Sequence, residues 1–170
     1  MDETHQLIVE QIPHLRRYAR ALLRDTIEAD DLVQDCLTRA MDRLHLWKPG
    51  ANIKAWLFTI LHNQHINQAK RRTNRPDSIA IEPVHENLNQ NPPGQEFRIT
   101  VRDVNHALDE LPSDQRQVIL LIGLEGLDYQ EAAEILDIPL GTVMSRLNRG
   151  RQKMRVLMEP KDVPALRRVK

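Results

Sequence analysis

Residues 127–154 have the sequence LDYQEAAEILDIPLGTVMSRLNRGRQKM, which predicts two short helices joined by a tight turn. Asp128 is a favourable N-cap, and Glu131 follows three positions later, as in a capping box. The first helix must end before Pro139, because proline disfavours the helical conformation at the residue preceding it. Thr142 is expected to cap the second helix, whose inward positions are the apolar residues Val143, Leu147 and Met154. This pattern predicts a helix-turn-helix, in which the second helix enters a DNA groove.

The remaining faces of the second helix carry polar and basic side chains. These are Ser145, Arg146, Arg149 and Arg151. In a helix-turn-helix they would donate hydrogen bonds to bases and phosphates. An ordinary helical hairpin with a solvated arginine face is the alternative. Because the caps, the turn, the core spacing and the basic face agree over about 25 residues, the DNA-binding interpretation is favoured.

Charge is unevenly distributed along the 170 residues, although the formal net charge is zero. Residues 1–50 carry seven basic and nine acidic residues, and residues 51–75 carry five basic residues and no acidic one. Residues 76–137 carry three basic and thirteen acidic residues, and residues 138–170 carry nine basic and two acidic residues. Two separate basic blocks that alternate with acidic ones are typical of a protein with two nucleic-acid contacts and further protein contacts.

The single cysteine and the lack of long apolar runs indicate a cytoplasmic protein. Cys36 lies on the apolar face of a predicted helix, so we expect a buried thiol, with neither a disulfide nor a cysteine-based metal site. The first residues, MDETHQLIVEQI, do not form a signal peptide. No apolar run is long enough for a membrane span, so membrane insertion is not expected.

Helical periodicity covers most of the chain and predicts an all-α fold. Apolar spacing predicts helices over about 8–22, 29–44 and 53–72, with Pro13 marking a start or a kink in the first and Asn52 capping the third. Residues 73–97 contain four prolines and several asparagines, which indicates a flexible linker. Helices follow from Val101 onward. We therefore expect two small helical domains, over residues 1–72 and 98–160, followed by a tail over 161–170.

The helix over residues 52–72 is unusual because it combines an aromatic core with amides and no acidic residue. Its amides are Asn63, Gln64, Asn67 and Gln68, and it ends in the basic run Lys70, Arg71 and Arg72. Amide and basic groups on one helix can contact base edges and phosphates, and pockets beside it could hold an extruded base. A solvated amphipathic helix explains these residues equally well at this point.

Three motifs in order resemble the extracytoplasmic-function (ECF) sigma factors, the compact members of the bacterial sigma-70 family. They are DDLVQDCLTRAM at 30–41, NIKAWLFTILHN at 52–63, and the helix-turn-helix sequence at 127–154. The resemblance implies a sigma2 domain at about 1–72, a linker, and a sigma4 helix-turn-helix domain at about 98–160. It also implies a promoter-specificity subunit that acts with core RNA polymerase, without a cofactor and without catalysis by this chain.

The resemblance also implies roles for individual residues. Polymerase docking on the beta-prime clamp would fall to Asp31, Leu32, Val33, Gln34 and Asp35, and the sigma4 domain would contact the beta flap. Melting and reading of the minus-10 element would involve Asn63, Asn67, Lys70, Arg71 and Arg72. Contacts to the minus-35 element would come from Thr142, Ser145, Arg146, Arg149 and Arg151. Met144 departs from the family, which commonly has arginine or lysine there.

The same resemblance implies a second protein partner, an anti-sigma factor that blocks the polymerase-binding surfaces. Residues 111–135 are weakly similar to general-stress members of the family from alphaproteobacteria. Promoter DNA and core polymerase would be the other partners.

Three other interpretations remain. A sigma-like decoy would occupy an anti-sigma factor without binding DNA, but it would not need the basic residues at 70–72 and 146–151. A one-component repressor would not explain residues 30–72. An enzyme would need a site, and His62 and His65, which are three residues apart, lack a third metal ligand. We expect these histidines to be solvated or to face DNA.

Overall fold

The computed structural model describes residues 2–74 and 95–159, and from Gln95 to Thr100 it describes the backbone only. Within these ranges every regular element is a helix and none is a strand, as the apolar periodicity predicts. The predicted linker over 73–97 lies mostly outside the described residues, and the predicted tail over 161–170 lies wholly outside them.

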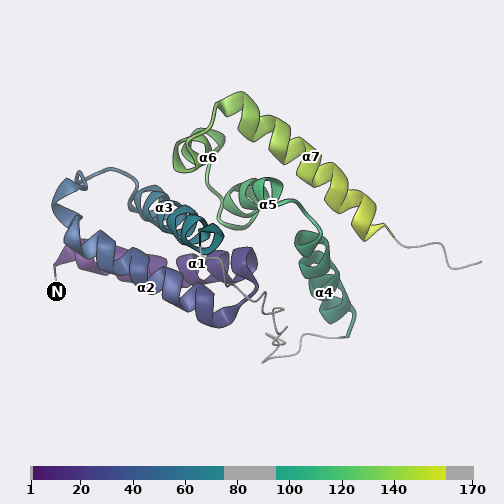
Figure 1. The fold of residues 1–170 in the computed structure, drawn as a ribbon, viewed down its shortest axis with the longest axis horizontal. Coiled ribbons are helices and arrows are strands. Elements are labelled where there is room, and N and C mark those ends of the chain that lie inside the picture. The colour runs from purple at the N-terminus through teal and green to yellow at the C-terminus, as the bar shows by residue number, and fades with distance from the viewer. Residues whose placement is uncertain (1, 75–94, 160–170) are drawn as a thin grey trace, which may run out of the picture.

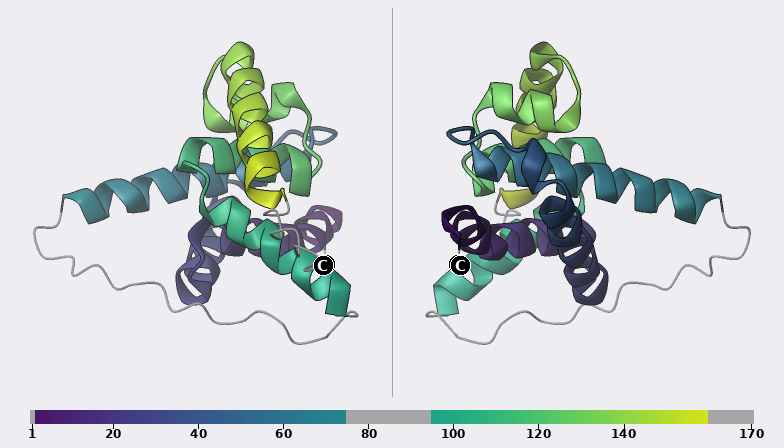
Figure 2. Two further views of the ribbon diagram at one scale, coloured as in Figure 1. Left: turned by 90° about the vertical axis from the view of Figure 1, so that its right-hand side faces the viewer. Right: turned by 90° about the vertical axis from the view of Figure 1, so that its left-hand side faces the viewer.

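The first unit is a bundle of three helices, α1 (Glu3–Leu23), α2 (Thr26–Asp42) and α3 (Ile53–Thr73), with a 3₁₀ turn η1 (Leu44–Leu46) between the last two. Pro13 lies inside α1, which continues through it. The Asp25 carboxylate caps α2, and the Asn52 side chain caps α3 as predicted, by accepting from the backbone N–H of Ala55 at 3.3 Å. Helix α3 is long and its buried residues lie between Ile53 and Gln64, so its last turns extend beyond the core of the bundle (Figure 2).

The second unit contains α4 (Gln95–Asp109), α5 (Ser113–Ile119), one π-helical turn η2 (Leu120–Leu124), α6 (Tyr129–Leu136) and α7 (Leu140–Met158). The predicted capping box is present at α6, since Asp128 and Glu131 each accept from the other's backbone N–H at 2.7 and 3.0 Å. The expected cap at Thr142 is wrong. Helix α7 begins at Leu140, with Pro139 at the N-cap position, so Thr142 lies inside the first turn, where its backbone N–H donates to the Pro139 carbonyl at 3.0 Å.

The two units pack against each other and share one apolar core (Figure 1). Helix α3 contacts α6, and α1 contacts both α5 and η2. In this closed arrangement the helix-turn-helix of α6 and α7 lies beside the first half of α3, while the last turns of α3 point away from it (Figures 1 and 2).

Among the residues that the structure describes, no helix is both long enough and apolar enough to cross a membrane.

Candidate nucleic-acid interface

Helix α7 buries one face and offers the opposite face to solvent. Val143, Leu147 and Gly150 are buried against the rest of the unit, whereas Ser145, Arg149 and Arg151 are exposed. Ser145 and Arg149 therefore lie on the face opposite the buried one, whereas Arg151 lies at the side of the helix, beside Leu147 and Met144. A DNA groove would take this face in the usual docking geometry.

The other two predicted residues of α7 are less available. The Arg146 guanidinium extends toward α5, where its Nε lies 3.6 Å from the Asp114 carboxylate, and 28% of its side chain is exposed. Thr142 is half-buried, and its backbone carbonyl accepts from the Ser145 hydroxyl at 3.1 Å. Any DNA contact by Arg146 would compete with its pairing to Asp114.

Met144, at the position where the family commonly has a basic residue, is exposed at 51%. It lines a shallow hollow of about 170 Å³ between the start of α6 and the middle of α7, together with Tyr129, Leu147, Asn148 and Arg151. The exposed thioether cannot form an ion pair, so Arg151 is the one charged side chain among the residues that line this hollow.

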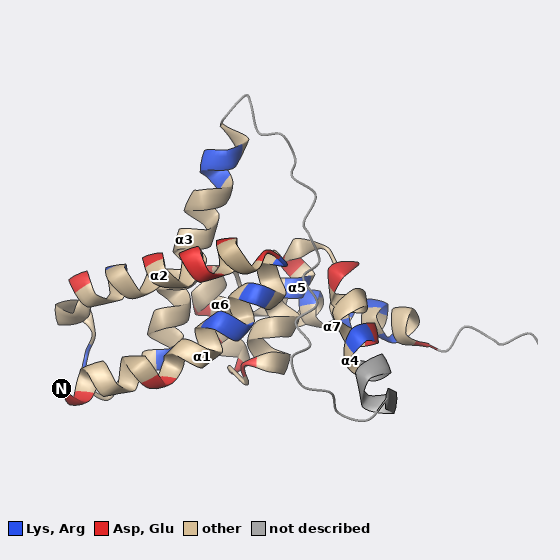
Figure 3. Ribbon diagram, turned by 90° about the horizontal axis from the view of Figure 1, so that it is seen from below, with Lys and Arg blue, Asp and Glu red and all other residues tan. Residues whose placement is uncertain are grey.

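On α3, the predicted minus-10 residues lie along the half of the helix that extends from the bundle. Asn63, Asn67, Lys70 and Arg71 are exposed. Arg72 is half-exposed and forms a 2.6 Å ion pair through Nη2 to Oε1 of Glu28 in α2. The basic run forms a band near the free end of α3 (Figure 3).

Two polar residues of α3 lie elsewhere than predicted. Gln64 is 8% exposed and His62 is 6% exposed, so neither is available to a base or phosphate. The expectation that both histidines are solvated or DNA-facing is wrong for His62, because α3 packs against α1, α2 and α6 and buries most of its faces. Burial and the charge of His65 lower the pKa of His62 to about 4. Burial also lowers the pKa of His65.

The predicted docking residues on α2 divide by burial. Asp31, Gln34 and Asp35 are exposed, whereas Leu32 and Val33 are 0% and 2% exposed and belong to the core. A partner would therefore contact the polar side chains of Asp31, Gln34 and Asp35, and the two apolar residues would hold α2 in place. The same three polar side chains line an acidic hollow of about 440 Å³, together with Glu28, Gln68 and Arg72. Gln68 donates across it to Asp35 at 3.1 Å.

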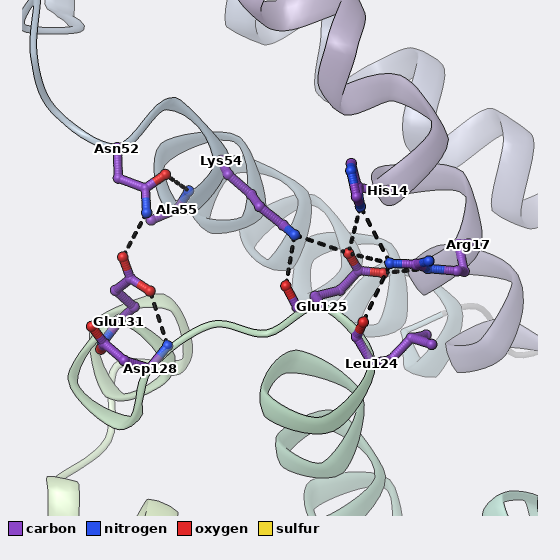
Figure 4. A network of polar contacts seen from close by, with 9 residues as sticks. All are labelled: His14, Arg17, Asn52, Lys54, Ala55, Leu124, Glu125, Asp128 and Glu131. Atoms are coloured by element: carbon purple, nitrogen blue, oxygen red, sulfur yellow. Dashed lines mark hydrogen bonds and ion pairs between the residues drawn. The ribbon is translucent and has the colours of Figure 1, made fainter.

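A buried carboxylate that the sequence did not indicate lies between the two units (Figure 4). The Glu125 side chain is fully enclosed and accepts from Arg17 Nε at 3.0 Å and from His14 Nδ1 at 3.1 Å. Lys54 Nζ lies 3.3 Å from it and also donates to the Glu125 carbonyl at 2.6 Å. The hydrogen bond to Glu125 raises the pKa of Arg17. No local signal could have found Glu125, since its partners are at least 71 residues away.

Cys36 is buried as predicted, and burial raises the pKa of its thiol to about 12. In the part of the chain that the structure describes, no three His, Cys, Asp or Glu side chains gather in a way that could hold a metal ion.

Two family models match the two units. The model of sigma-70 region 4 matches residues 102–154, and the model described as the sigma2 domain of PhyR matches residues 8–62. The chain is also 36% identical over 157 residues to the ECF RNA polymerase sigma factor EcfG of Rhodopseudomonas palustris, covering 92% of this chain and 86% of that protein. The chain belongs to the ECF family of RNA polymerase sigma factors.

Solved structures resemble this ECF sigma factor over nearly its whole length. The sigma factor RpoE of Bartonella quintana, in complex with the anti-sigma factor NepR, is 32% identical with a TM-score of 0.74, and the match covers 95% of this chain and 100% of that one. The anti-anti-sigma factor PhyR of the same organism, also in complex with NepR, is 18% identical with a TM-score of 0.58. That match covers 92% of this chain and 51% of PhyR, and it shows a shared fold alone.

Proposed function

We propose that this chain directs core RNA polymerase to specific promoters and helps to melt their minus-10 element. The observation that carries the proposal is the exposed surface of α7, the second helix of a region 4 helix-turn-helix, where Ser145, Arg149 and Arg151 are all open to solvent. The chain would work by binding and positioning, without chemistry of its own, and it would act in the cytoplasm with the polymerase.

In this proposal, residues 1–72 dock on the polymerase and read the minus-10 element, and residues 98–160 read the minus-35 element. The exposed Asp31, Gln34 and Asp35 contact the beta-prime clamp. Asn63 and Asn67 face the minus-10 bases, because an amide offers both a donor and an acceptor to a base's pairing edge. The basic run of α3 holds the adjacent phosphates.

A regulatory partner is part of the proposal. The similar sigma factor of Bartonella quintana was solved bound to the anti-sigma factor NepR. We therefore propose that an anti-sigma factor also binds this chain and covers its polymerase-docking surfaces. Copurification with this chain would identify that partner.

A second candidate function is a sigma-like decoy that titrates an anti-sigma factor and does not bind DNA. The match of residues 8–62 to the sigma2 domain of PhyR favours it, since PhyR is an anti-anti-sigma factor. The exposed Arg149 and Arg151 favour the sigma factor, because a decoy has no use for side chains that contact phosphates.

In vitro transcription with core polymerase across a promoter library distinguishes the candidates. The sigma factor should yield specific transcripts that are lost when Arg149 and Arg151 are both changed to alanine. A decoy would yield none at any promoter while still binding the anti-sigma factor. The isolated chain should bind duplex promoter DNA weakly and in a salt-sensitive way. Tight specific binding by the free chain at physiological salt would instead support a one-component repressor.

A further inference from the structure

Glu125 belongs to the second unit, but all the side chains that contact its carboxylate belong to the first. Arg17 and His14 reach it from α1, and Lys54 reaches it from α3 (Figure 4). Arg17 Nη2 also donates to the carbonyl of Leu124 at 3.3 Å. Within its own unit, only the backbone N–H of Glu125 is bonded, to the Leu120 carbonyl. The carboxylate therefore contributes to the packing of one unit on the other rather than to the fold of either.

Full burial makes this carboxylate sensitive to the loss of any partner. A carboxylate without solvent contact is strongly destabilising unless cations and hydrogen bonds compensate it, and here two basic side chains and a histidine do so. When the units separate, water solvates all four groups. Replacement of Glu125 alone leaves Arg17 and Lys54 facing a neutral group in the closed form, so closure should become less favourable.

Further polar contacts join the units at two other places, one on either side of Glu125. The Asn52 amide donates to Glu131 Oε1 at 2.6 Å, so the cap of α3 and the capping box of α6 are bonded to each other. At the far side, Arg24 pairs with the Asp109 carboxylate at 2.8 Å and Arg116 donates to the Leu22 carbonyl at 3.4 Å. The closed arrangement is thus held at three places along one interface.

This arrangement does not fit a promoter. The minus-10 and minus-35 elements are about 25 base pairs apart, which at about 3.4 Å per pair is roughly 85 Å of duplex. In the closed form the N-terminal ends of α3 and α6 are instead in hydrogen-bond contact. The 20 residues from 75 to 94 can extend to about 70 Å, so the chain is long enough for the units to separate.

We propose that Glu125 is the centre of an intramolecular lock, in which the region 4 unit docks on α1 and α3 and keeps the free chain closed. The lock must open before the two DNA-reading helices can engage one promoter. This consequence rests on the proposed function, whereas the lock itself is a property of the free chain. The occupant of the docking surface on α1 and α3 is the chain's own second unit.

The distance between the units in the free chain tests the lock without polymerase. Spin labels at Met41→Cys in α2 and Val156→Cys in α7 report this distance, since both side chains are exposed and the native Cys36 is fully buried. The otherwise unchanged chain should give one narrow, short distance distribution. Glu125→Gln should give a broad distribution at longer distances. The exposed Glu110→Gln, with the same charge change, should keep the narrow one.

A second variant, in the first unit, distinguishes opening of the lock from unfolding of the chain. Arg17→Gln should open the chain as Glu125→Gln does, and the double variant should open it no further than the larger single effect, because both remove one contact. Helical content by circular dichroism should stay unchanged. A loss of helical content in Glu125→Gln with an unchanged distance in Arg17→Gln would overturn the lock, as would a broad distribution in the unchanged chain.

Binding to core polymerase tests whether the lock must open before the chain can act in the holoenzyme. A closed majority lowers the apparent affinity by the fraction of open molecules, so Glu125→Gln should bind core polymerase about tenfold more tightly, while Glu110→Gln binds as the unchanged chain does. If Glu125→Gln opens the chain but no variant binds core polymerase, the proposed function fails and the lock stands. If affinity for core polymerase does not change although the chain opens, the lock has no role in holoenzyme formation, which overturns that part of the inference.

Discussion

Arg72, near the end of α3, and Glu28, in the first turn of α2, form a 2.6 Å ion pair between Nη2 and Oε1. The neighbouring Lys70 and Arg71 are exposed. The three residues of the basic run therefore differ, since the Arg72 guanidinium already has a carboxylate partner on α2, whereas Lys70 and Arg71 are exposed and available to phosphates.

The salt dependence of promoter binding should reveal this difference. Lys70→Ala and Arg71→Ala in the holoenzyme should each reduce the slope of log affinity against log salt concentration by about 0.7 to 0.9, the value for one lost phosphate contact. Arg72→Ala should reduce it less, because Arg72 must first leave Glu28. The measurement is promoter affinity between about 50 and 200 mM salt. Equal slopes for all three variants would show that the Glu28 pair does not persist in the complex.

Asn63 and Asp31 should separate base reading from polymerase docking. Asn63 is exposed on α3, so Asn63→Ala should leave the fold and core binding intact, reduce open-complex formation and relax preference at one minus-10 position. A lost contact of this kind costs about 1–3 kcal/mol of discrimination. Asp31→Arg should impair core binding, because it reverses a charge in the acidic hollow of α2.

Core affinity and open-complex formation measured side by side test this division. Asn67→Ala, one turn further along the same exposed face, serves as the neighbouring comparison. If Asn63→Ala lost core binding as badly as Asp31→Arg, α2 and α3 would not have the separate roles proposed for them.

Local signals in the sequence were sufficient to predict the helix-turn-helix. The capping box of Asp128 and Glu131 and the cap at Asn52 form over three residues, so the sequence alone specifies them. Burial on several sides is not local. Helix α3 is covered by α1, α2 and α6, which buries His62 and Gln64 although their sequence context is polar. Glu125 shows the same limit, because its partners come from helices at the other end of the chain.

The buried imidazole of His62 predicts a pH dependence of stability. Its pKa is lowered to about 4 in the folded chain by burial and by His65, against 6.5 in the unfolded chain. The unfolded chain therefore binds more protons between these values. The neutral His62 therefore contributes to the free energy of unfolding fully above pH 6.5, and this contribution is lost as the pH falls to about 4. The loss is at most about 3 kcal/mol. The lowered pKa of His65 acts in the same direction.

Urea unfolding at several pH values between 4 and 7 measures this contribution. His62→Leu should lose less free energy of unfolding toward low pH than the unchanged chain, because the leucine does not titrate. The exposed His45→Gln should follow the unchanged chain. An identical pH dependence in His62→Leu would show that this imidazole is accessible to protons in the folded protein.

Met144 gives the region 4 surface a gap in its positive charge, and filling the gap should strengthen DNA binding. Its side chain is 51% exposed beside Arg151 and Asn148 at the hollow between α6 and α7. Met144→Lys should add one phosphate contact, which raises promoter affinity at low salt and steepens the salt slope by about 0.9. Val9, whose side chain is exposed on α1, is the control position, because Val9→Lys adds the same charge outside region 4. It should leave the slope unchanged.

Holoenzyme affinity for a promoter with a minus-35 element, measured across a salt series, distinguishes the two variants. Equal slopes for both would mean that position 144 lies away from the phosphates, and that the apolar residue there does not set the affinity for DNA.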